Sequence, residues 1–398
     1  MKWFSLIISI LMALPAFADL ERWQKWEVER NDLQSNEQLY HKLPNIQELK
    51  AYQTKTLYMV EVEPRFVDFI HAPGLEGVPN ELRSADGKIK FFIHPSSLHL
   101  FNELISHGKL TKVEAKPTTS PRTFFVSDLL VKVSLSDKIN GAIRTVYPLQ
   151  MQRATAVSSE LSKIPEALQK EHSFGFLQEP LGVFDKTPNS PFGFLIRKIP
   201  QDIKNGQNTL VPLLSYVAKN QGESLLEQDA KSQGKSSLEI VEKSLIPALT
   251  KSYAFAVSEG VVIEAHQQNT LLELDSKGQF TGRVFYRDLD GARIDFELRK
   301  KMGLSTDLLK LQDSGWIFDL ENLQKIRETT TVPKGRPEIW SPVAEKAFQM
   351  YLLGSSVYLL KKAVESQKGY SPFKIDKIID EELQRIPHSV NSCRSVFR

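Results

Sequence analysis

Residues 259–291, EGVVIEAHQQNTLLELDSKGQFTGRVFYRDLDG, constrain the fold more than any other part of this chain. Two short apolar runs, LLELD and RVFYRDLD, are separated by the turn-forming residues Lys277, Gly278 and Gln279. This pattern predicts a β-hairpin. Polar side chains gather at its ends: His266, Gln268, Asn269, Arg287 and Asp288. A hairpin holds such groups rigidly, as a site requires, whereas the alternative is an ordinary hairpin with solvated polar ends.

The first 18 residues have the pattern of a cleavable secretory signal. Lys2 gives a positive start, residues 3–14 form an apolar run too short to span a bilayer, and Ala16 and Ala18 are the small residues expected before a cleavage site. We therefore predict cleavage after Ala18 and a periplasmic or secreted mature chain. No later segment is long and apolar enough for stable membrane insertion. An uncleaved N-terminal anchor is the alternative.

Charge and cysteine content exclude several classes of protein. The 51 Lys and Arg residues nearly balance the 48 Asp and Glu residues, which argues against nucleic acid as the main partner. The single cysteine, Cys393, cannot form an internal disulfide, and the eight histidines lack zinc-site spacing. Stability must therefore come from an apolar core. After signal removal, about 380 residues remain, enough for two or three subdomains.

The remaining periodicity predicts strands and helices in mixed order. Strand patterns occur at 55–70, 88–93, 122–135 and 192–198, and helical patterns at 96–108, 149–170, 238–259 and, mainly, from 300 to the end. Residues 19–52 are expected to form one or two surface helices. Residues 220–237 are polar and contain Gly and Ser, which predicts a flexible loop.

A second polar cluster lies between residues 120 and 144. Its members bind phosphate well: Ser120, Arg122, Thr123, Lys132 and Arg144. Hydroxyl, ammonium and guanidinium groups make charge-assisted hydrogen bonds to anionic oxygens. On the predicted strand, Lys132 shares one face with Leu130 and Ser134, and Val131 shares the other with Val133. Taken alone, this cluster could also be a solvated strand face with no ligand. Together with the polar residues of the hairpin, it favours a nucleotide site.

The order of these motifs resembles the NRPS-independent siderophore (NIS) synthetases, the aerobactin-synthetase-like IucA/IucC family. The matching runs are Ser120-Pro-Arg122-Thr123, Lys132, Asn140-x-x-x-Arg144, Glu264-Ala-His266-Gln-Gln268-Asn269 and Arg287-Asp288. The run FGFLIRK at 192–198 is similar to a family strand that ends in Leu-Arg. The resemblance extends from about residue 88 to about residue 300 and more loosely to the end.

The resemblance implies a reaction and a role for each matched position. The family adenylates a carboxylic acid, often citrate, with ATP and passes the acyl group to an amine or alcohol acceptor. The implied nucleotide-binding residues are Ser120, Arg122, Thr123, Lys132, Arg144, Gln268, Asn269 and Asp288, with Asp288 contacting Mg²⁺. The implied substrate residues are His94, Asn140, Arg144, Glu264 and His266. The implied catalytic residues are Lys132, Arg144 and His266. Fixed cations suit this chemistry because adenylation brings two anions together.

Two features depart from the family pattern. The upstream Gly-His-Pro-x-His-Pro element is absent, and His94-Pro95 is followed by two serines where the family often has Trp-Gln. The sequence therefore does not specify which carboxylic acid is the substrate. The predicted export signal also differs from a family that works in the cytoplasm, where ATP is plentiful. Since the family often dimerises, a homodimer is an open expectation.

Three functions follow from these observations. The first is the ATP-dependent ligase. The second is an exported, non-catalytic binding protein that uses the same anion pocket for a carboxylate siderophore or a nucleotide. The third is a kinase-like phosphotransferase, because HQQN followed by RDLDG is similar to a catalytic loop and a metal-binding Asp. Gln268 stands where the kinase Asp is expected, which disfavours the third.

We predict an α+β fold in which a central antiparallel sheet carries the nucleotide pocket and a helical C-terminal subdomain closes one side. The expected division is a signal peptide at 1–18, a reduced N-terminal subdomain at 19–110, a nucleotide- and carboxylate-binding core at 111–300 and the helical subdomain at 301–398.

Overall fold

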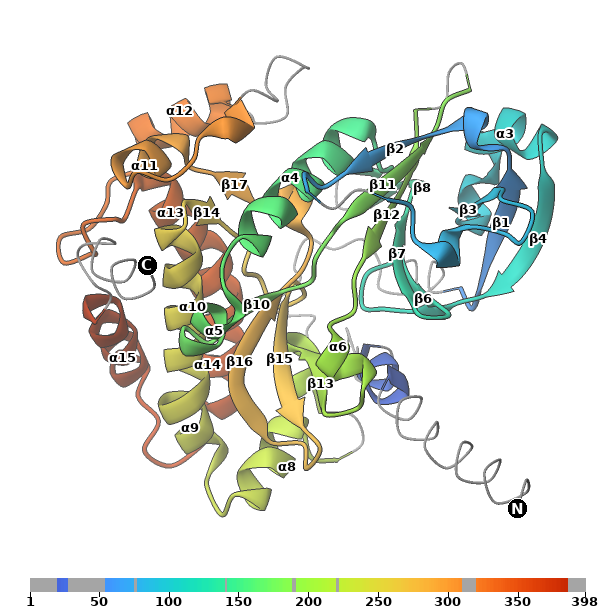
Figure 1. The fold of residues 1–398 in the computed structure, drawn as a ribbon. Helices are drawn as coiled ribbons and strands as arrows, with labels where there is room; N and C mark the ends of the chain where they lie inside the picture. The colour runs from blue at the N-terminus through green and yellow to red at the C-terminus, as the bar shows by residue number, and fades with distance from the viewer. Residues whose placement is uncertain are drawn as a thin grey trace, which may run out of the picture.

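The computed structural model describes residues 20–27, 54–74, 77–139, 142–187, 191–219, 222–309 and 320–385. The predicted signal at 1–18 and Cys393 lie outside these ranges. Figure 1 shows a mixed arrangement in which a small sheet, a central sheet and a third, helix-backed sheet follow one another across the molecule. The predicted α+β class is confirmed.

The first sheet contains three antiparallel strands in the order β3-β1-β4. They are β1 (Thr56–Val62), β3 (Ile89–Ile93) and β4 (Lys109–Glu114). The connection from β3 to β4 forms the 3₁₀ helix η4 (Pro95–Phe101) and the short helix α3 (Asn102–Ser106), so the helix predicted at 96–108 is present. His94 precedes η4, and its side chain accepts a hydrogen bond from the backbone N–H of Ser96.

The central sheet has six strands in the order β2-β11-β12-β7-β6-β5, and every neighbouring pair is antiparallel. The strands are β2 (Val67–His71), β5 (Lys116–Pro117), β6 (Thr123–Val126), β7 (Leu129–Val133), β11 (Leu181–Asp185) and β12 (Gly193–Arg197). One face packs on the first sheet through Phe124, Val131 and Phe194. Because side chains alternate, Lys132 and Arg197 point to the other face.

The third sheet contains the predicted hairpin. Its order is β10-β16-β15-β13, with β10 and β16 parallel and the other pairs antiparallel. The strands are β10 (Phe174–Phe176), β13 (Asn208–Pro212), β15 (Thr270–Asp275) and β16 (Phe280–Tyr286). Gly278 turns the chain between β15 and β16 with φ +82°, a conformation that glycine adopts without strain.

Two short ladders and several helices complete the described chain. The ladders pair β8 (Leu135–Ile139) with β9 (Ala142–Arg144) and β14 (Val261–Val262) with β17 (Arg293–Ile294). The α-helices are α4 (Pro148–Ser162), α5 (Glu166–Glu171), α6 (Gln201–Lys204), α7 (Leu213–Val217), α8 (Leu225–Ser232), α9 (Ser237–Ile240), α10 (Ile246–Ser258), α11 (Phe296–Lys301), α12 (Leu320–Thr329), α13 (Pro342–Ala347), α14 (Tyr358–Val364) and α15 (Pro372–Gln384). The π-helical segments η5 (Val241–Leu245) and η8 (Phe348–Val357) continue α9 and α13, and the 3₁₀ helices η2 (Pro64–Phe66), η3 (Asn80–Leu82) and η6 (Leu289–Gly291) occupy connections.

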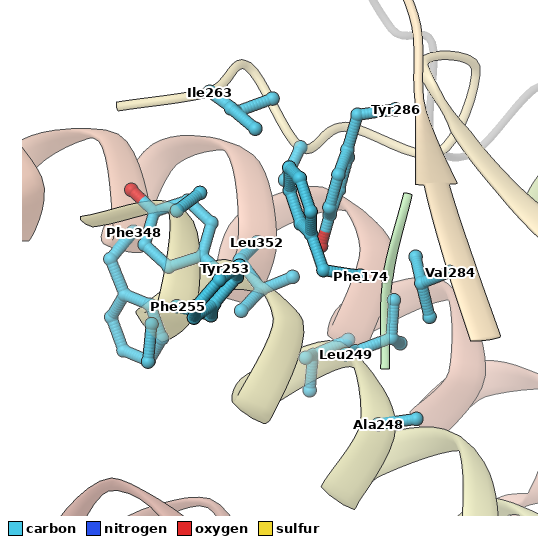
Figure 2. Packing of buried hydrophobic residues seen from close by; sticks show 14 of the residues in the cluster. Phe174, Ala248, Leu249, Tyr253, Phe255, Ile263, Val284, Tyr286, Phe348 and Leu352 are labelled. Carbon is cyan, nitrogen blue, oxygen red and sulfur yellow. The ribbon is translucent and has the colours of Figure 1, made fainter. Parts of the chain in front are cut away.

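The largest apolar core joins the third sheet to the C-terminal helices through α10. Figure 2 shows Tyr253 of α10 among Phe174 from β10, Tyr286 from β16 and Phe348 from η8. The Tyr253 hydroxyl also donates to the carbonyl of Ala344, 3.1 Å away. The helices after residue 300 therefore share one core with the preceding region. The predicted boundary at 110 is crossed as well, since β2 belongs to the central sheet.

Two sequence expectations differ from the structure. The segment predicted as a flexible loop, 220–237, contains helix α8, which begins with a capping box in which Ser224 and Glu227 satisfy each other's backbone N–H groups. Residues 20–27 form a helix as predicted, with Glu21 and Lys25 exposed, but its other face is packed inside, because Trp23 and Glu27 are fully buried. Within the described ranges, no helix has the length and apolar composition needed to cross a membrane.

Candidate functional site

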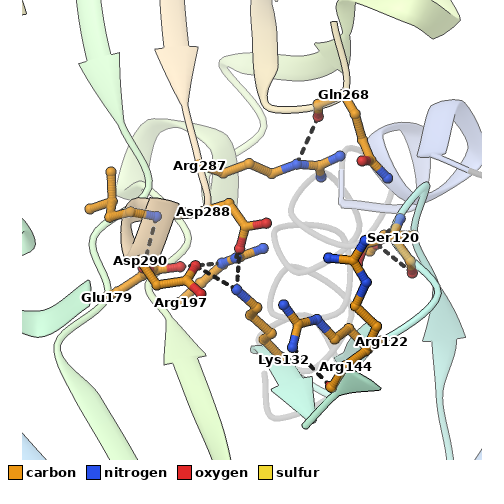
Figure 3. A network of polar contacts seen from close by, with 12 residues as sticks. Ser120, Arg122, Lys132, Arg144, Glu179, Arg197, Gln268, Arg287, Asp288 and Asp290 are labelled. Carbon is orange, nitrogen blue, oxygen red and sulfur yellow. Dashed lines mark hydrogen bonds and ion pairs between the residues drawn. The ribbon is translucent and has the colours of Figure 1, made fainter. Parts of the chain in front are cut away.

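The candidate site begins where β7 meets the end of the hairpin. Lys132 of β7 is buried and lies opposite Thr123 of β6. Its ammonium group donates to the carboxylate of Asp288 and, at 2.7 Å, to that of Asp290 (Figure 3). Asp288 follows strand β16 in a left-handed conformation, with φ 70° and ψ 55°. The hairpin and the second polar cluster therefore meet, as the sequence predicted.

A buried arginine on β12 fixes the same carboxylate from a second direction. Arg197 donates from Nε to Glu179, 2.6 Å away, and from Nη2 to Asp288. Glu179 in turn accepts from the backbone N–H of Leu289 at 3.1 Å. Burial raises the pKa of Glu179. Burial alone would also raise the pKa of Asp288, but the charges of Lys132, Arg197 and Arg122 hold it well below its ordinary value, so Asp288 is ionised.

Two further guanidinium groups face this carboxylate. Figure 3 shows Arg122 and Arg144 side by side, with their charged ends on the side of Lys132 and Asp288. Arg122 donates to the backbone carbonyls of Arg144 (2.9 Å) and Thr145 (3.3 Å), and Arg144 donates from Nε to that of Ile139 (3.1 Å). Burial, and next the repulsion from Arg122, lower the pKa of Arg144. Because adjacent cations repel each other, an anion bound between them would be stabilised.

The turn before the hairpin supplies His266, Gln268 and Asn269. His266 accepts the backbone N–H of Gln268 at Nδ1, 3.3 Å away. Burial lowers the pKa of His266 to about 4, and the opposing charge of Asp288 does not reverse the shift, so the imidazole is neutral at pH 7. Gln268 donates from Nε2 to the carbonyl of Thr119 at 2.8 Å. Asn269 is buried, and its carbonyl accepts the backbone N–H of Arg287 at 3.1 Å.

Glu264 lies beside His266 and is held by a C-terminal residue. The hydroxyl of Tyr351, on η8, donates to Glu264 at 2.8 Å, and the Tyr351 ring centroid is 6.2 Å from that of His266. Burial raises the pKa of Glu264 against the opposing effect of this hydrogen bond. A Cβ atom at Gly291 would lie 2.4 Å from Oε2 of Glu264, so only glycine leaves this carboxyl its position.

The other predicted site residues have different placements. Thr123 is buried on the same strand face as Lys132, and Ser120 lies in the loop before β6, where its N–H donates to Oγ1 of Thr118 at 3.1 Å. His94 is an exception. Its ring packs 5.8 Å from that of Phe124, which points to the face of the sheet opposite Lys132, so the structure does not bring His94 to this cluster. Asn140 lies outside the described residues.

Several members of the site were not predicted from the sequence. Arg197 is the second-last residue of the run FGFLIRK, which predicted a strand similar to a family strand but no site residue, and Asp290 stands two residues after Asp288 in RDLDG. No local sequence pattern marks Glu179 as a site residue, since it lies in the connection before β11 and its partner Arg197 lies 18 positions away on β12. Among the residues that the structure describes, no group of three His, Cys, Asp or Glu side chains could hold a metal ion.

Comparison with known proteins identifies relatives of part of the chain. Residues 50–218 match the IucA / IucC family. The chain is 28% identical over 198 residues to staphyloferrin A synthase of Staphylococcus aureus (strain NCTC 8325 / PS 47), a match that covers 46% of this chain and 32% of that protein. The matched region thus spans about a third of the length of this curated relative.

Solved structures share the fold at lower sequence identity. Petrobactin biosynthesis protein AsbB from Bacillus anthracis str. Sterne aligns with a TM-score of 0.60 at 16% identity, covering 86% of this chain and 62% of that one. Aerobactin synthetase IucA from a hypervirulent pathotype of Klebsiella pneumoniae aligns at 0.56 and 17%, covering 83% and 62%. Its ATP-bound structure aligns at 0.58 and 16%, covering 94% and 75%. The resemblance to the IucA/IucC family of NIS synthetases that the motifs predicted is therefore confirmed, through the family match at residues 50–218 and the shared fold.

Proposed function

We propose that this chain is an ATP-dependent, siderophore-synthetase-like ligase, which adenylates a carboxylic acid and transfers the acyl group to an amine or a hydroxyl. The observation that carries the proposal is the convergence of Lys132, Arg122 and Arg144 on the ionised Asp288, across about 150 residues of sequence. The family match and the likeness of the fold to an ATP-bound aerobactin synthetase support it.

In this proposal the cations bind the triphosphate. Lys132 and Arg122 would contact phosphate oxygens, with the hydroxyls of Ser120 and Thr123 beside them. Oγ1 of Thr123 is buried without a hydrogen-bond partner in the described part of the chain, and a bound oxygen would satisfy it. Fixed cations in a buried site stabilise the charge that develops on departing pyrophosphate.

Asp288 fits a magnesium ion that arrives with the nucleotide. Its ion pairs with Lys132 and Arg197 both use Oδ1, which leaves Oδ2 as the oxygen to contact the metal. Mg²⁺ is usually held by one or two carboxylates and by phosphate oxygens, and a site with few protein ligands agrees with that habit. When bound, the ion would neutralise phosphate charge and so favour pyrophosphate as the leaving group.

The carboxylic acid and the acceptor would be bound by Arg144, His266 and Glu264. Arg144 lies near enough to Arg122 and to the carboxylates of Asp288, Asp290 and Glu264 for their charges to affect its pKa, and a substrate carboxylate would be drawn to its charge. The neutral imidazole of His266 offers a hydrogen bond without adding charge. Holding acid, nucleotide and acceptor together supplies much of the remaining rate enhancement through proximity.

A hydroxamate-trapping screen tests the proposal. The purified chain would be mixed with Mg-ATP, hydroxylamine and each of a panel of carboxylic acids, with pyrophosphate release and ATP affinity measured in parallel. We expect at least one acid to give both the acyl hydroxamate and pyrophosphate. Lys132→Met and Arg144→Gln should each lose activity by roughly 100-fold or more while keeping the wild-type circular dichroism spectrum. The matched controls are the exposed residues Lys138 and Arg83, whose replacement by Ala should change nothing.

The other outcomes separate the alternative functions. Tight nucleotide or siderophore binding without pyrophosphate release would favour the non-catalytic binding protein. Release of ADP and phosphate transfer to an acceptor would favour the kinase-like reading. No binding of Mg-ATP at millimolar concentration would overturn the ligase.

We also propose that the mature chain is exported after cleavage behind Ala18, on the pattern of residues 1–18. N-terminal sequencing of the protein from a periplasmic or secreted fraction should then begin at Asp19. Protein that retains Met1 and stays with the cytoplasmic fraction would contradict export.

A further inference from the structure

The helix of residues 20–27 is part of the packing around the candidate site. Trp23 is fully buried in a core with Phe125 of β6, Leu130 of β7 and Phe285 of β16. Its ring meets that of Phe125 edge-on, with 5.0 Å between the centroids. This core anchors the helix to the strands that carry Thr123 and Lys132 and to the hairpin that ends in Asp288.

Glu27 lies at the end of this helix as a buried carboxylate with three partners. Oε1 accepts from the indole N–H of Trp23 at 3.0 Å and from Nη1 of Arg287 at 2.6 Å. Oε2 accepts from the backbone N–H of Thr119 at 2.9 Å. Glu27 and Arg287 are both almost fully buried, so the charge of each depends on the other.

Arg287 extends these contacts to the turn before the hairpin. Besides Glu27, its guanidinium donates from Nη2 to Oγ1 of Thr119 and from Nε to the carbonyl of Gln268, 3.0 Å away. The Gln268 side chain returns to the carbonyl of Thr119 at 2.8 Å. Thr119 is therefore held through its N–H by Glu27, through its hydroxyl by Arg287 and through its carbonyl by Gln268.

We propose that Glu27 is a positioning residue for nucleotide binding. Thr119 directly precedes Ser120 and lies three positions before Arg122, whereas Gln268 belongs to the turn on the other side of the site. Glu27 fixes Thr119 directly, and through Arg287 it fixes the separation between the Ser120–Arg122 loop and Gln268. This role rests on the proposed function, since it assumes that these residues contact the nucleotide. Prearranged binding groups lose less entropy when the ligand binds.

The chain offers a matched control for a purely structural effect. Glu160 is also buried, and its partner Arg299 likewise uses the rest of its guanidinium to hold two backbone carbonyls, those of Glu259 and Ser305. These partners belong to α11 and to the connections beside it, not to the loops that hold Thr119 and Gln268. Glu160→Gln therefore removes a comparable buried charge without disturbing the proposed nucleotide contacts.

The experiment compares Glu27→Gln, Arg287→Lys and Glu160→Gln in the full chain. Melting temperature, the Kd for Mg-ATP by calorimetry, and KM and kcat for pyrophosphate release would be measured for each. Glu27→Gln should weaken Mg-ATP binding by ~10- to 100-fold and raise KM for ATP more than it lowers kcat. Glu160→Gln should lower the melting temperature by a similar amount and leave the Kd within about twofold of wild type. Arg287→Lys keeps the positive charge opposite Glu27 but loses the planar guanidinium that donates to several partners at once. It should therefore weaken ATP binding with a smaller loss of melting temperature than Glu27→Gln.

Each result decides the role of Glu27. If Glu27→Gln fails to fold, Arg287→Lys carries the test alone, and an unchanged Kd in that variant overturns the proposal. If the wild type binds ATP and both Glu27→Gln and Arg287→Lys bind it equally tightly, the positioning role is overturned. The proposed function then still stands. A wild type that binds no ATP overturns the proposed function and this role with it.

Discussion

Nζ of Lys132 lies 2.7 Å from Oδ1 of Asp290, although 158 positions separate the two residues in sequence. The same ammonium group also binds Asp288, so one buried cation is shared by two carboxylates. A triphosphate that enters the site must therefore compete with Asp290 for Lys132.

Asp290→Asn tests this competition. Removing one negative charge beside Lys132 should strengthen binding of metal-free ATP by a few-fold, on the order of 3- to 10-fold, because more of the ammonium charge becomes available to phosphate. Calorimetry in the presence of a chelator measures the effect without a contribution from magnesium. Asp86→Asn, on an exposed turn, is the control. Weaker binding by the Asp290 variant would show that this carboxylate assists the nucleotide instead.

Arg197→Met should be strongly destabilising. The substitution leaves Glu179 without its guanidinium partner in a fully buried place and removes one of the two cations that bind Asp288. Breaking a buried pair from one side typically costs about 3–5 kcal/mol. Urea unfolding gives the free energy. Lys186→Met is the comparison, because Lys186 and Asp68 are both about half exposed and such a pair is worth about 0–1 kcal/mol. Equal losses in the two variants would contradict the expectation.

The pH dependence of stability should report His266. Burial lowers its pKa from 6.5 to about 4, so the folded chain keeps the imidazole neutral where the unfolded chain binds a proton. The contribution of His266 to the free energy of unfolding is therefore fully present above pH 6.5. It falls by on the order of 3 kcal/mol as the pH drops from 6.5 to 4. His266→Gln should lose less stability across that window than the wild type in urea titrations. Parallel losses would show that His266 titrates normally.

Gly291→Ala should displace Glu264 rather than unfold the chain. The new methyl group would lie 2.4 Å from Oε2 of Glu264, at the end of a side chain that can rotate away, so we expect a stability loss of only about 1 kcal/mol. The hydrogen bond from Tyr351 to Glu264 should break. Gly291→Ala and Tyr351→Phe should therefore lower activity by similar factors, and the double variant should be no worse than either. Multiplying losses would show that the two residues act separately.

Gly260→Ala should lower stability through both backbone strain and a steric clash, and Gly234→Ala measures the strain alone. Gly260 has φ +67°, and an added Cβ would lie 2.2 Å from Cγ of Arg299. Gly234 has nearly the same conformation, φ +64°, with open space around it. Gly234→Ala should thus cost only the left-handed strain of about 1–2 kcal/mol, and Gly260→Ala should cost clearly more. Thermal unfolding of both variants measures the difference, and similar melting temperatures would contradict the steric argument.

Local pattern was sufficient for the hairpin and for the strand pair that carries Lys132. In both, short apolar runs are joined by a turn, and the structure has the strands at those positions. The alternation of side chains along β6 explains the placement of His94. It packs on Phe124, which neighbours Thr123 in sequence but points to the opposite face, and adjacency in sequence could not reveal this.

Long-range partners were beyond the reach of the pattern. Glu27 and Glu179 look like ordinary surface carboxylates in their own segments, and only the packed chain supplies Arg287 and Arg197 to neutralise them. Helix α8 was missed for a local reason. Its polar composition suggested a loop, whereas the reciprocal hydrogen bonds of Ser224 and Glu227 start a helix even in a polar segment.

The contact between Glu27 and Arg287 spans 260 positions, which has a consequence for how the chain is made. At a synthesis rate of about 5–20 residues per second, the glutamate leaves the ribosome roughly 10–50 s before its arginine exists. During that interval the segment that carries Trp23 and Glu27 has no final docking place, so the apolar surface that it later buries against β6, β7 and β16 stays exposed.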